Sequence, residues 1–141
     1  MFKRILVAYD GSQHAKRALE VAIDMAKRYG AKIYVVEVVD TATILGLSMG
    51  PVPPDVLDSI REKAKADLAE AKAKVQSEGV EVETVMLEGD PAGAIVDYSE
   101  RIGADIIVTG SRGLSTIKRV FLGSVSTGVV THAKKPVLVV K

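Results

Sequence analysis

Short runs of apolar, often β-branched residues alternate along the chain with segments whose apolar residues recur every three or four positions. The runs are typical of strands, and the spaced segments are typical of amphipathic helices. Ser12 and Asp90 have side chains that cap helix N-termini, and Gly30 is placed to end the first helix. We predict strands at 5–9, 32–39, 81–87, 105–109 and 136–141, and helices at 12–30, 55–78, 90–103 and 124–134.

One segment breaks this rhythm. Residues 41–54 contain two glycines and three prolines, which predicts irregular chain rather than a helix or strand. The segment also carries apolar residues, among them Ile44, Leu45 and Leu47. Three roles stay open for it: a lid over a ligand, a surface for a protein partner, or a plain connection.

Alternating strands and helices predict an α/β fold with a parallel sheet covered on both faces. Because crossovers between parallel strands are right-handed, few topologies remain, and we expect one doubly wound five-stranded sheet in the order 3-2-1-4-5. In that order the chain reverses direction between strands 1 and 4, where open α/β sheets bind ligands. The residues after strand 1, Asp10 to Ser12, and those from Gly110 onward should therefore line one crevice.

Length and composition narrow the function classes. The 141 residues fit a single domain, 1–141. The net charge of +1 argues against a surface built for nucleic acid or anionic membrane. The chain has no cysteine and two histidines, which excludes thiol chemistry and argues against a metal site made of protein ligands alone. The first ten residues fit a strand better than a signal peptide, so we expect a cytoplasmic protein.

The most informative motif is a set of glycines after the fourth strand. Gly110 and Gly113 follow that strand, and after nine further residues Gly123 and Ser124 open a helix. Glycine lets the backbone approach a ligand closely, and a helix N-terminus offers unpaired N–H groups and partial positive charge. The spacing therefore favours a phosphate-binding loop over a set of turn glycines, which is the alternative.

At these residues the sequence resembles the universal stress protein family, in its ATP-binding subgroup. The subgroup signature Gly-x2-Gly-x9-Gly-Ser/Thr is matched by Gly110, Gly113, Gly123 and Ser124. The opening strand that ends in Asp10 and the closing segment 135–140 also match, so the resemblance covers residues 2–141. It implies an adenine-nucleotide-binding, Rossmann-like (HUP-like) fold, ATP with Mg²⁺ or Mn²⁺ held through the phosphates, and homodimers that pair through strand 137–140.

The resemblance also implies a set of site residues. Asp10 would lie near the sugar or a metal-bridged phosphate, Val38 would contact adenine through its backbone, and Gly110 would lie against the ribose. Gly113 and the segment 123–126 would surround the phosphates. The full expected ATP-binding set is Ala8, Tyr9, Asp10, Ser12, Val38, Thr109, Gly110, Ser111, Arg112, Gly113, Gly123, Ser124, Val125 and Ser126.

Some residues depart from the family pattern. Ala8 stands where many members carry proline, and Arg112 and Glu37 stand where histidine is common. Arg112 could pair with phosphate oxygens or be a solvated loop residue, and both alternatives stay open. Glu37 has no account at the level of sequence.

The remaining candidates have ordinary interpretations. His14 is predicted to be a surface histidine on the first helix, and His132 to lie near a helix C-terminus. Lys118 and Arg119 are predicted to be a solvated face. Asp10 is the only candidate acid that can be placed in the crevice, so no catalytic residue is proposed. We therefore expect an ATP-binding regulatory module, and a protein partner for it stays open. The alternatives are a slow ATPase or phosphotransferase, and a dimeric scaffold with a vestigial pocket.

Overall fold

The computed structural model describes residues 1–47, 52–112 and 122–141. Its strands are β1 (Arg4–Ala8), β2 (Lys32–Val39), β3 (Val82–Glu88), β4 (Ile106–Gly110) and β5 (Val137–Val140). Its helices are α1 (Gln13–Tyr29), α2 (Thr41–Leu47), α3 (Pro54–Ser77), α4 (Pro91–Arg101) and α5 (Ser124–His132). All five predicted strands and all four predicted helices are present, with ends that differ by at most two residues.

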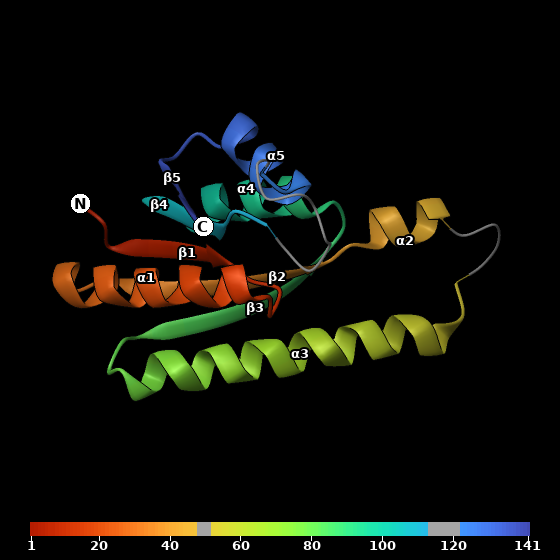
Figure 1. Ribbon diagram of the computed structural model, residues 1–141, viewed down its shortest axis with the longest axis horizontal. Helices are drawn as coiled ribbons and strands as arrows, with labels where there is room; N and C mark the ends of the chain where they lie inside the picture. Colours follow the sequence, from red (N-terminus) through yellow and green to blue (C-terminus); the bar gives the residue numbers. More distant parts are fainter. Residues whose placement is uncertain (48–51, 113–121) are drawn as a thin grey trace.

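The five strands form one parallel sheet in the order β3-β2-β1-β4-β5, which confirms the predicted topology. Helices α1 and α3 cover one face of this sheet, and α4 and α5 cover the other (Figure 1). The side chains of β1 show why both faces must be covered, because Ile5 and Val7 pack in the first core while Leu6 packs in the second. All three are fully buried, as expected for a central parallel strand.

Capping side chains fix where two of the helices begin. The Ser12 hydroxyl accepts a hydrogen bond from the Ala15 N–H at the start of α1, and the Asp90 carboxylate accepts one from the Gly93 N–H at the start of α4. Gly30 ends α1 in the left-handed conformation, with a φ of 64°. These three predictions from the sequence are confirmed. The two caps set the first residues of α1 and α4, and Gly30 sets the end of α1.

The prediction of irregular chain over 41–54 is wrong for its first half, where residues 41–47 form α2. The reason is a local cap: Asp40 Oδ1 accepts from the Thr43 N–H at 2.9 Å, and Oδ2 accepts from the Thr43 hydroxyl at 2.8 Å. Helix α2 and the start of α3 extend beyond the end of the sheet (Figure 1).

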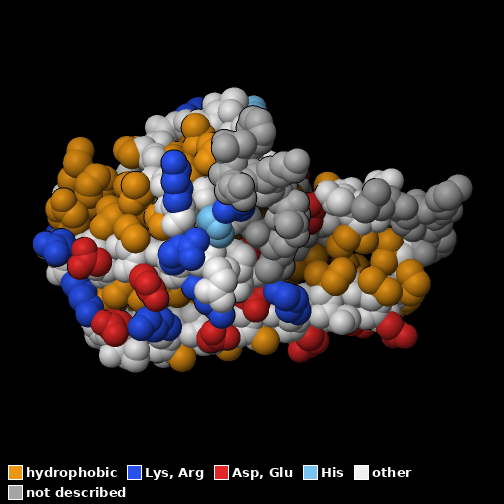
Figure 2. All heavy atoms as spheres, in the orientation of Figure 1, with side chains coloured by type: hydrophobic (Ala, Val, Ile, Leu, Met, Phe, Trp, Pro, Cys, Tyr) orange, Lys and Arg blue, Asp and Glu red, His pale blue; other side chains and the backbone are white. Residues whose placement is uncertain are grey.

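The surface formed by α1 and α3 carries both acidic and basic side chains. Figure 2 shows acidic and basic side chains interspersed over α1 and α3. Several of them form ion pairs between the two helices or within one, such as Lys16 with Glu70 and Lys63 with Asp67. In the described ranges, the helices include none that is long and apolar enough to cross a membrane.

Candidate functional site

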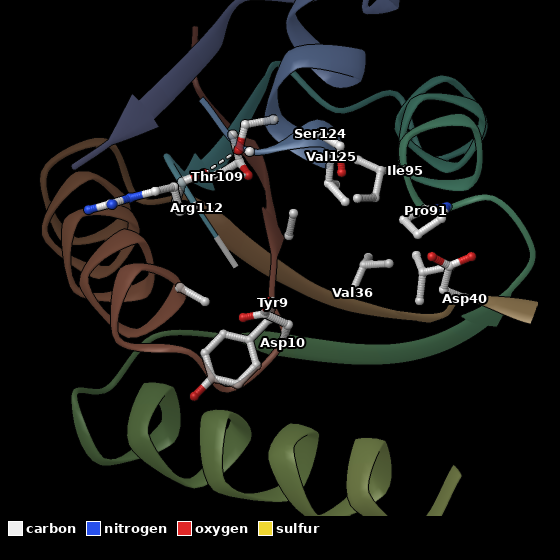
Figure 3. Close-up of a pocket in the computed structure, with 16 residues that line it drawn as sticks. Tyr9, Asp10, Val36, Asp40, Pro91, Ile95, Thr109, Arg112, Ser124 and Val125 are labelled. Carbon is white, nitrogen blue, oxygen red and sulfur yellow. Dashed lines mark hydrogen bonds between the residues drawn. The ribbon is translucent and has the colours of Figure 1, made fainter. Parts of the chain in front are cut away.

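A cavity of about 310 Å³ opens at the carboxyl ends of β1 and β4, where the chain changes direction across the sheet (Figure 3). This is the switch point at which open α/β sheets bind ligands. The cavity is large enough for a small organic ligand. Its lining comes from both ends of the sequence: Ala8, Tyr9, Asp10, Ala15, Val36, Val38, Asp40, Pro91, Ile95, Thr109, Gly110, Arg112, Gly123, Ser124, Val125 and Ser126.

All but three of the residues predicted for the site line this cavity. Ser12 is adjacent in sequence but outside the lining, since its hydroxyl caps α1. Ser111 is also outside the lining, and its hydroxyl contacts His14. Gly113 lies outside the described residues, as do Lys118 and Arg119.

The N-terminus of α5 faces the cavity through Gly123, Ser124 and Val125. Unlike α1 and α4, this helix has no side-chain cap, because its N-cap residue is Gly123. The first N–H groups of an uncapped helix lack intrahelical partners and carry the positive end of the helix dipole. The start of α5 is therefore suited to an anion such as phosphate.

Gly110, the last residue of β4, contacts both α1 and α5. A Cβ built on Gly110 would lie 2.8 Å from the backbone carbon of His14, so only glycine allows α1 to pack this closely on the end of β4. The Gly110 carbonyl in turn accepts a hydrogen bond from the Ser126 hydroxyl. That bond occupies the Ser126 hydroxyl and ties α5 to β4, which holds the helix N-terminus at the cavity.

Asp10 lies in a tight turn after β1. Its carboxylate oxygen Oδ1 accepts from the Ser12 N–H at 2.9 Å, and Gly11 has a φ of 78°, which favours glycine. Lys63 of α3 donates to the Asp10 backbone carbonyl at 3.3 Å. Among the described residues, no backbone N–H is seen to donate to the second carboxylate oxygen of Asp10, a residue that lines the cavity.

The side of the cavity formed by β2 and α4 is mainly apolar and was only partly predicted. The Asp40 carboxylate lies beside Pro91 on this side, so the expectation that Asp10 is the only acid in the crevice is wrong (Figure 3). Val36 and Val38 come from β2, and Pro91 and Ile95 come from the first two turns of α4 (Figure 3). Val36 could have been found from the sequence, because it precedes Val38 by two residues and so shares its face of the strand. The α4 residues could not, since nothing in the sequence shows which turn of a helix meets the sheet edge.

His14 is more than the surface histidine that the sequence suggests. Its Nδ1 lies 2.8 Å from the Ser111 hydroxyl, and its Nε2 lies 3.3 Å from Nη2 of Arg112. Burial and the neighbouring Arg17 and Arg112 guanidinium groups lower the pKa of His14, so its imidazole is neutral at pH 7. The Arg112 side chain points toward α1 and away from the centre of the cavity (Figure 3).

The described residues include no group of three or more His, Cys, Asp and Glu side chains that could hold a metal ion. The site therefore offers a helix N-terminus suited to an anion, carboxylates at Asp10 and Asp40, and a mainly apolar slot between β2 and α4. That combination suits an elongated ligand with a phosphate at one end and a flat apolar group at the other.

Comparison with known proteins identifies the family of the chain. The model of the universal stress protein family matches residues 1–141. Universal stress protein YxiE of Bacillus subtilis is 37% identical over 150 residues, with both chains fully covered. The structure of the Archaeoglobus fulgidus universal stress protein in complex with dAMP has a TM-score of 0.76 and 29% identity, with both chains fully covered.

A universal stress protein in complex with cAMP has a TM-score of 0.73 and 27% identity, and the match covers 99% of this chain and 96% of that one. Together with the family match over the whole chain, these relatives establish the family. The chain belongs to the universal stress protein family.

Proposed function

We propose that this chain binds ATP at the switch-point cavity, with Mg²⁺ or Mn²⁺ held through the phosphates, and acts as a nucleotide-dependent regulatory module. One observation carries the proposal: the uncapped N-terminus of α5, Gly110 and Asp10 meet in one cavity whose β2 and α4 side is mainly apolar. Phosphate, sugar and base each have a suitable neighbour in that arrangement.

The polarity of the cavity suggests how the nucleotide lies. The phosphates belong at the start of α5, where Ser124 and Val125 present backbone N–H groups. The Gly123 N–H is donated to the Ser111 carbonyl at 2.7 Å, so Gly123 contributes its lack of a side chain rather than a donor. The ribose belongs beside Gly110 and Asp10, and the base belongs in the apolar slot near Val38. A divalent ion fits the phosphate end only as part of a metal–nucleotide complex, and Asp10 is one carboxylate of the cavity lining.

The ligands of related structures support an adenine nucleotide. Two universal stress proteins of this fold are described in complex with dAMP and with cAMP. Both ligands have one phosphate, and our preference for ATP comes from the glycine spacing 110–113–123 and the resemblance it carries.

Binding is a better proposal than rapid turnover. Phosphoryl transfer needs a group that positions the nucleophile. The two acids that line the cavity, Asp10 and Asp40, are each engaged, with the Ser12 N–H and with Thr43. Slow hydrolysis is the second candidate and would show as ADP release over hours.

We further propose that the chain is a cytoplasmic homodimer that pairs through residues 137–140. Strand β5 is an edge strand bonded only to β4, and its four residues are each half-buried. An apolar edge is prone to pair with another strand, and a second copy supplies one.

Calorimetric titration of nucleotide-free protein with ATP and Mg²⁺ tests the function. We expect saturable binding of about one nucleotide per chain, with micromolar affinity. The matched variant is Gly123→Val, because Gly123 has a φ of −64° and a ψ of 161°, which valine adopts without strain. We expect the variant to fold and to lose binding; unchanged affinity would refute the phosphate position.

A further inference from the structure

Glu37 of β2 is a buried acid outside the cavity lining. Its exposed fraction is 7%, and its Oε1 has no hydrogen-bond partner among the described residues. It points to the opposite face of the strand from Val36 and Val38, toward α3. A buried carboxylate with an unpartnered oxygen is strongly unfavourable, whereas the carbonyl oxygen of a neutral carboxylic acid tolerates it far better.

The other side of Glu37 meets a second acid, Asp67 of α3. Burial and then the side-chain hydrogen bond with Asp67 raise the pKa of Glu37 to about 9. Two carboxylates at hydrogen-bond distance do not both ionise, so one proton is shared between them. Asp67 is the ionised partner because Lys63 lies 2.7 Å from its Oδ2, and Glu37 is therefore the donor.

Asp67 rests against the turn that carries Asp10. A Cβ built on Gly11 would lie 2.8 Å from Oδ1 of Asp67 and 3.0 Å from its Cγ. Lys63 bridges the same two parts, because its ammonium donates to Asp67 and, at 3.3 Å, to the Asp10 carbonyl. The Asp10–Gly11 turn, which borders the cavity, is thus held in place by Asp67 and Lys63 of α3.

We propose that Glu37, Asp67 and Lys63 are positioning residues for the nucleotide site, with the proton shared by the two acids keeping α3 against the Asp10–Gly11 turn. The proposal rests on the proposed function for its link to ATP. It gives Glu37, which departs from the family pattern, a role that depends on its protonated form.

Several titratable side chains face Glu37 from the elements packed around it. Tyr9 and Asp10 face it from the end of β1, Lys63, Asp67 and Glu70 face this region from α3, and Lys16 of α1 pairs with Glu70 at 3.6 Å. Burial and the Glu70 carboxylate raise the pKa of Tyr9 to about 12, and the hydrogen bond with Asp67 raises the pKa of Lys63. The pKa of Glu37, about 9, lies below that of Tyr9 and below that of Lys63, which is raised from its ordinary value.

Loss of the shared proton should loosen the turn. Above pH 9 the two acids carry like charges at close range, and their repulsion displaces Asp67 from its place against Gly11. The ATP phosphates are already ionised in this range, so the ligand does not titrate. We expect the affinity for Mg·ATP to fall by about fivefold between pH 8 and pH 10.

Glu37→Gln is the matched variant, because glutamine keeps the shape and the donor of the neutral acid but cannot ionise. We expect its affinity at pH 8 to be within about twofold of the wild type and to change little up to pH 10. On α3, Lys63→Met should weaken binding by about fivefold at pH 8, whereas Lys65→Met, which removes an exposed lysine paired with Glu62, should leave it unchanged. Identical pH profiles for wild type and Glu37→Gln would overturn the proposal.

A second measurement does not need nucleotide. In NMR titrations of the free protein, the Gly11 amide resonance should shift with a midpoint near pH 9, together with the Glu37 carboxyl carbon, and the Gly11 shift should vanish in Glu37→Gln. A Gly11 amide that ignores Glu37 refutes the positioning role. A Gly11 shift in a protein that fails to bind ATP instead refutes the proposed function and leaves the turn contact standing.

Discussion

The His14 imidazole lies between two partners that determine which ring nitrogen carries the proton. A guanidinium can only donate, so Nε2 accepts from Arg112, and the proton sits on Nδ1 and is donated to the Ser111 hydroxyl. Protonation would place a hydrogen on Nε2 as well and set it against the Arg112 cation. The neutral ring therefore holds both Ser111 and Arg112, the two residues that follow β4.

This arrangement predicts a pH dependence of stability. The folded pKa of His14 lies below its ordinary 6.5, because of burial and the nearby Arg17 and Arg112. The unfolded chain then binds more protons, so the stabilising contribution of neutral His14 is present above pH 6.5 and is lost as pH falls through the folded pKa. Urea unfolding of wild type should lose stability between pH 7 and pH 5 more steeply than His14→Gln. Parallel slopes would contradict this prediction.

The close approach at Gly110 predicts a second residue-level effect. In Gly110→Ala the new methyl would lie 2.8 Å from the backbone carbon and Cβ of His14, and backbone on both sides resists the shift. We expect a loss of about 1–3 kcal/mol in the free energy of unfolding, measured with urea.

Gly46→Ala is the control for this substitution, because a Cβ at Gly46 in α2 meets nothing within 4 Å. It should leave stability unchanged or raise it by up to about 1 kcal/mol, as expected for alanine in a helix. Equal stability of Gly110→Ala and wild type would mean that α1 can move away from β4.

Among the elements, those with strong local signals were predicted from the sequence. Residues 32–39 are largely apolar and rich in β-branched side chains, and β2 has those bounds. Helix α2 was missed because Gly46 and the nearby prolines outweigh a short cap at Asp40. The contact of His14 with Arg112 was missed for a different reason: it depends on how α1 packs against β4, which no local pattern contains.

Helix α4 offers a test of how an element supports the site. Its cap is the Asp90 carboxylate on the Gly93 N–H, and its first two turns carry Pro91 and Ile95, two apolar residues of the cavity lining. We expect Asp90→Ala to lower the free energy of unfolding by about 1 kcal/mol.

The control within the same helix is Asp97→Ala, where the side chain is 73% exposed and pairs only with Arg101 at 3.5 Å. An exposed pair of this kind contributes less than about 0.5 kcal/mol. Urea unfolding followed by circular dichroism compares the two. A larger effect at Asp97 than at Asp90 would show that the cap does not hold α4.

At the scale of the whole molecule, the two edges of the sheet differ in chemistry. Edge strand β3 carries Glu83 and Glu88, which pair with Lys32 and Arg61, and charged side chains discourage strand-to-strand association. Edge strand β5 consists of Val137–Val140 and carries no charge. In Figure 2, hydrophobic side chains gather at the end of the molecule where the N-terminus lies in Figure 1, the same end at which β5 begins. The asymmetry favours β5 as the pairing edge of the proposed dimer.

Val139→Lys tests this edge without disturbing the interior. Val137, Leu138 and Val140 pack against the two cores, whereas Val139 belongs to neither cluster. A lysine there would place an unpaired charge in the proposed interface, which costs about 1–3 kcal/mol and weakens the dimer by about fivefold to a hundredfold. Val56→Lys makes the same change at a site on α3 that is 47% exposed and far from β5 in the fold. Sedimentation velocity over a range of concentrations should give a dimer for wild type and Val56→Lys and a monomer for Val139→Lys, because only Val139→Lys alters the edge strand. A Val139→Lys dimer of wild-type affinity would mean that the interface lies on another face of the molecule.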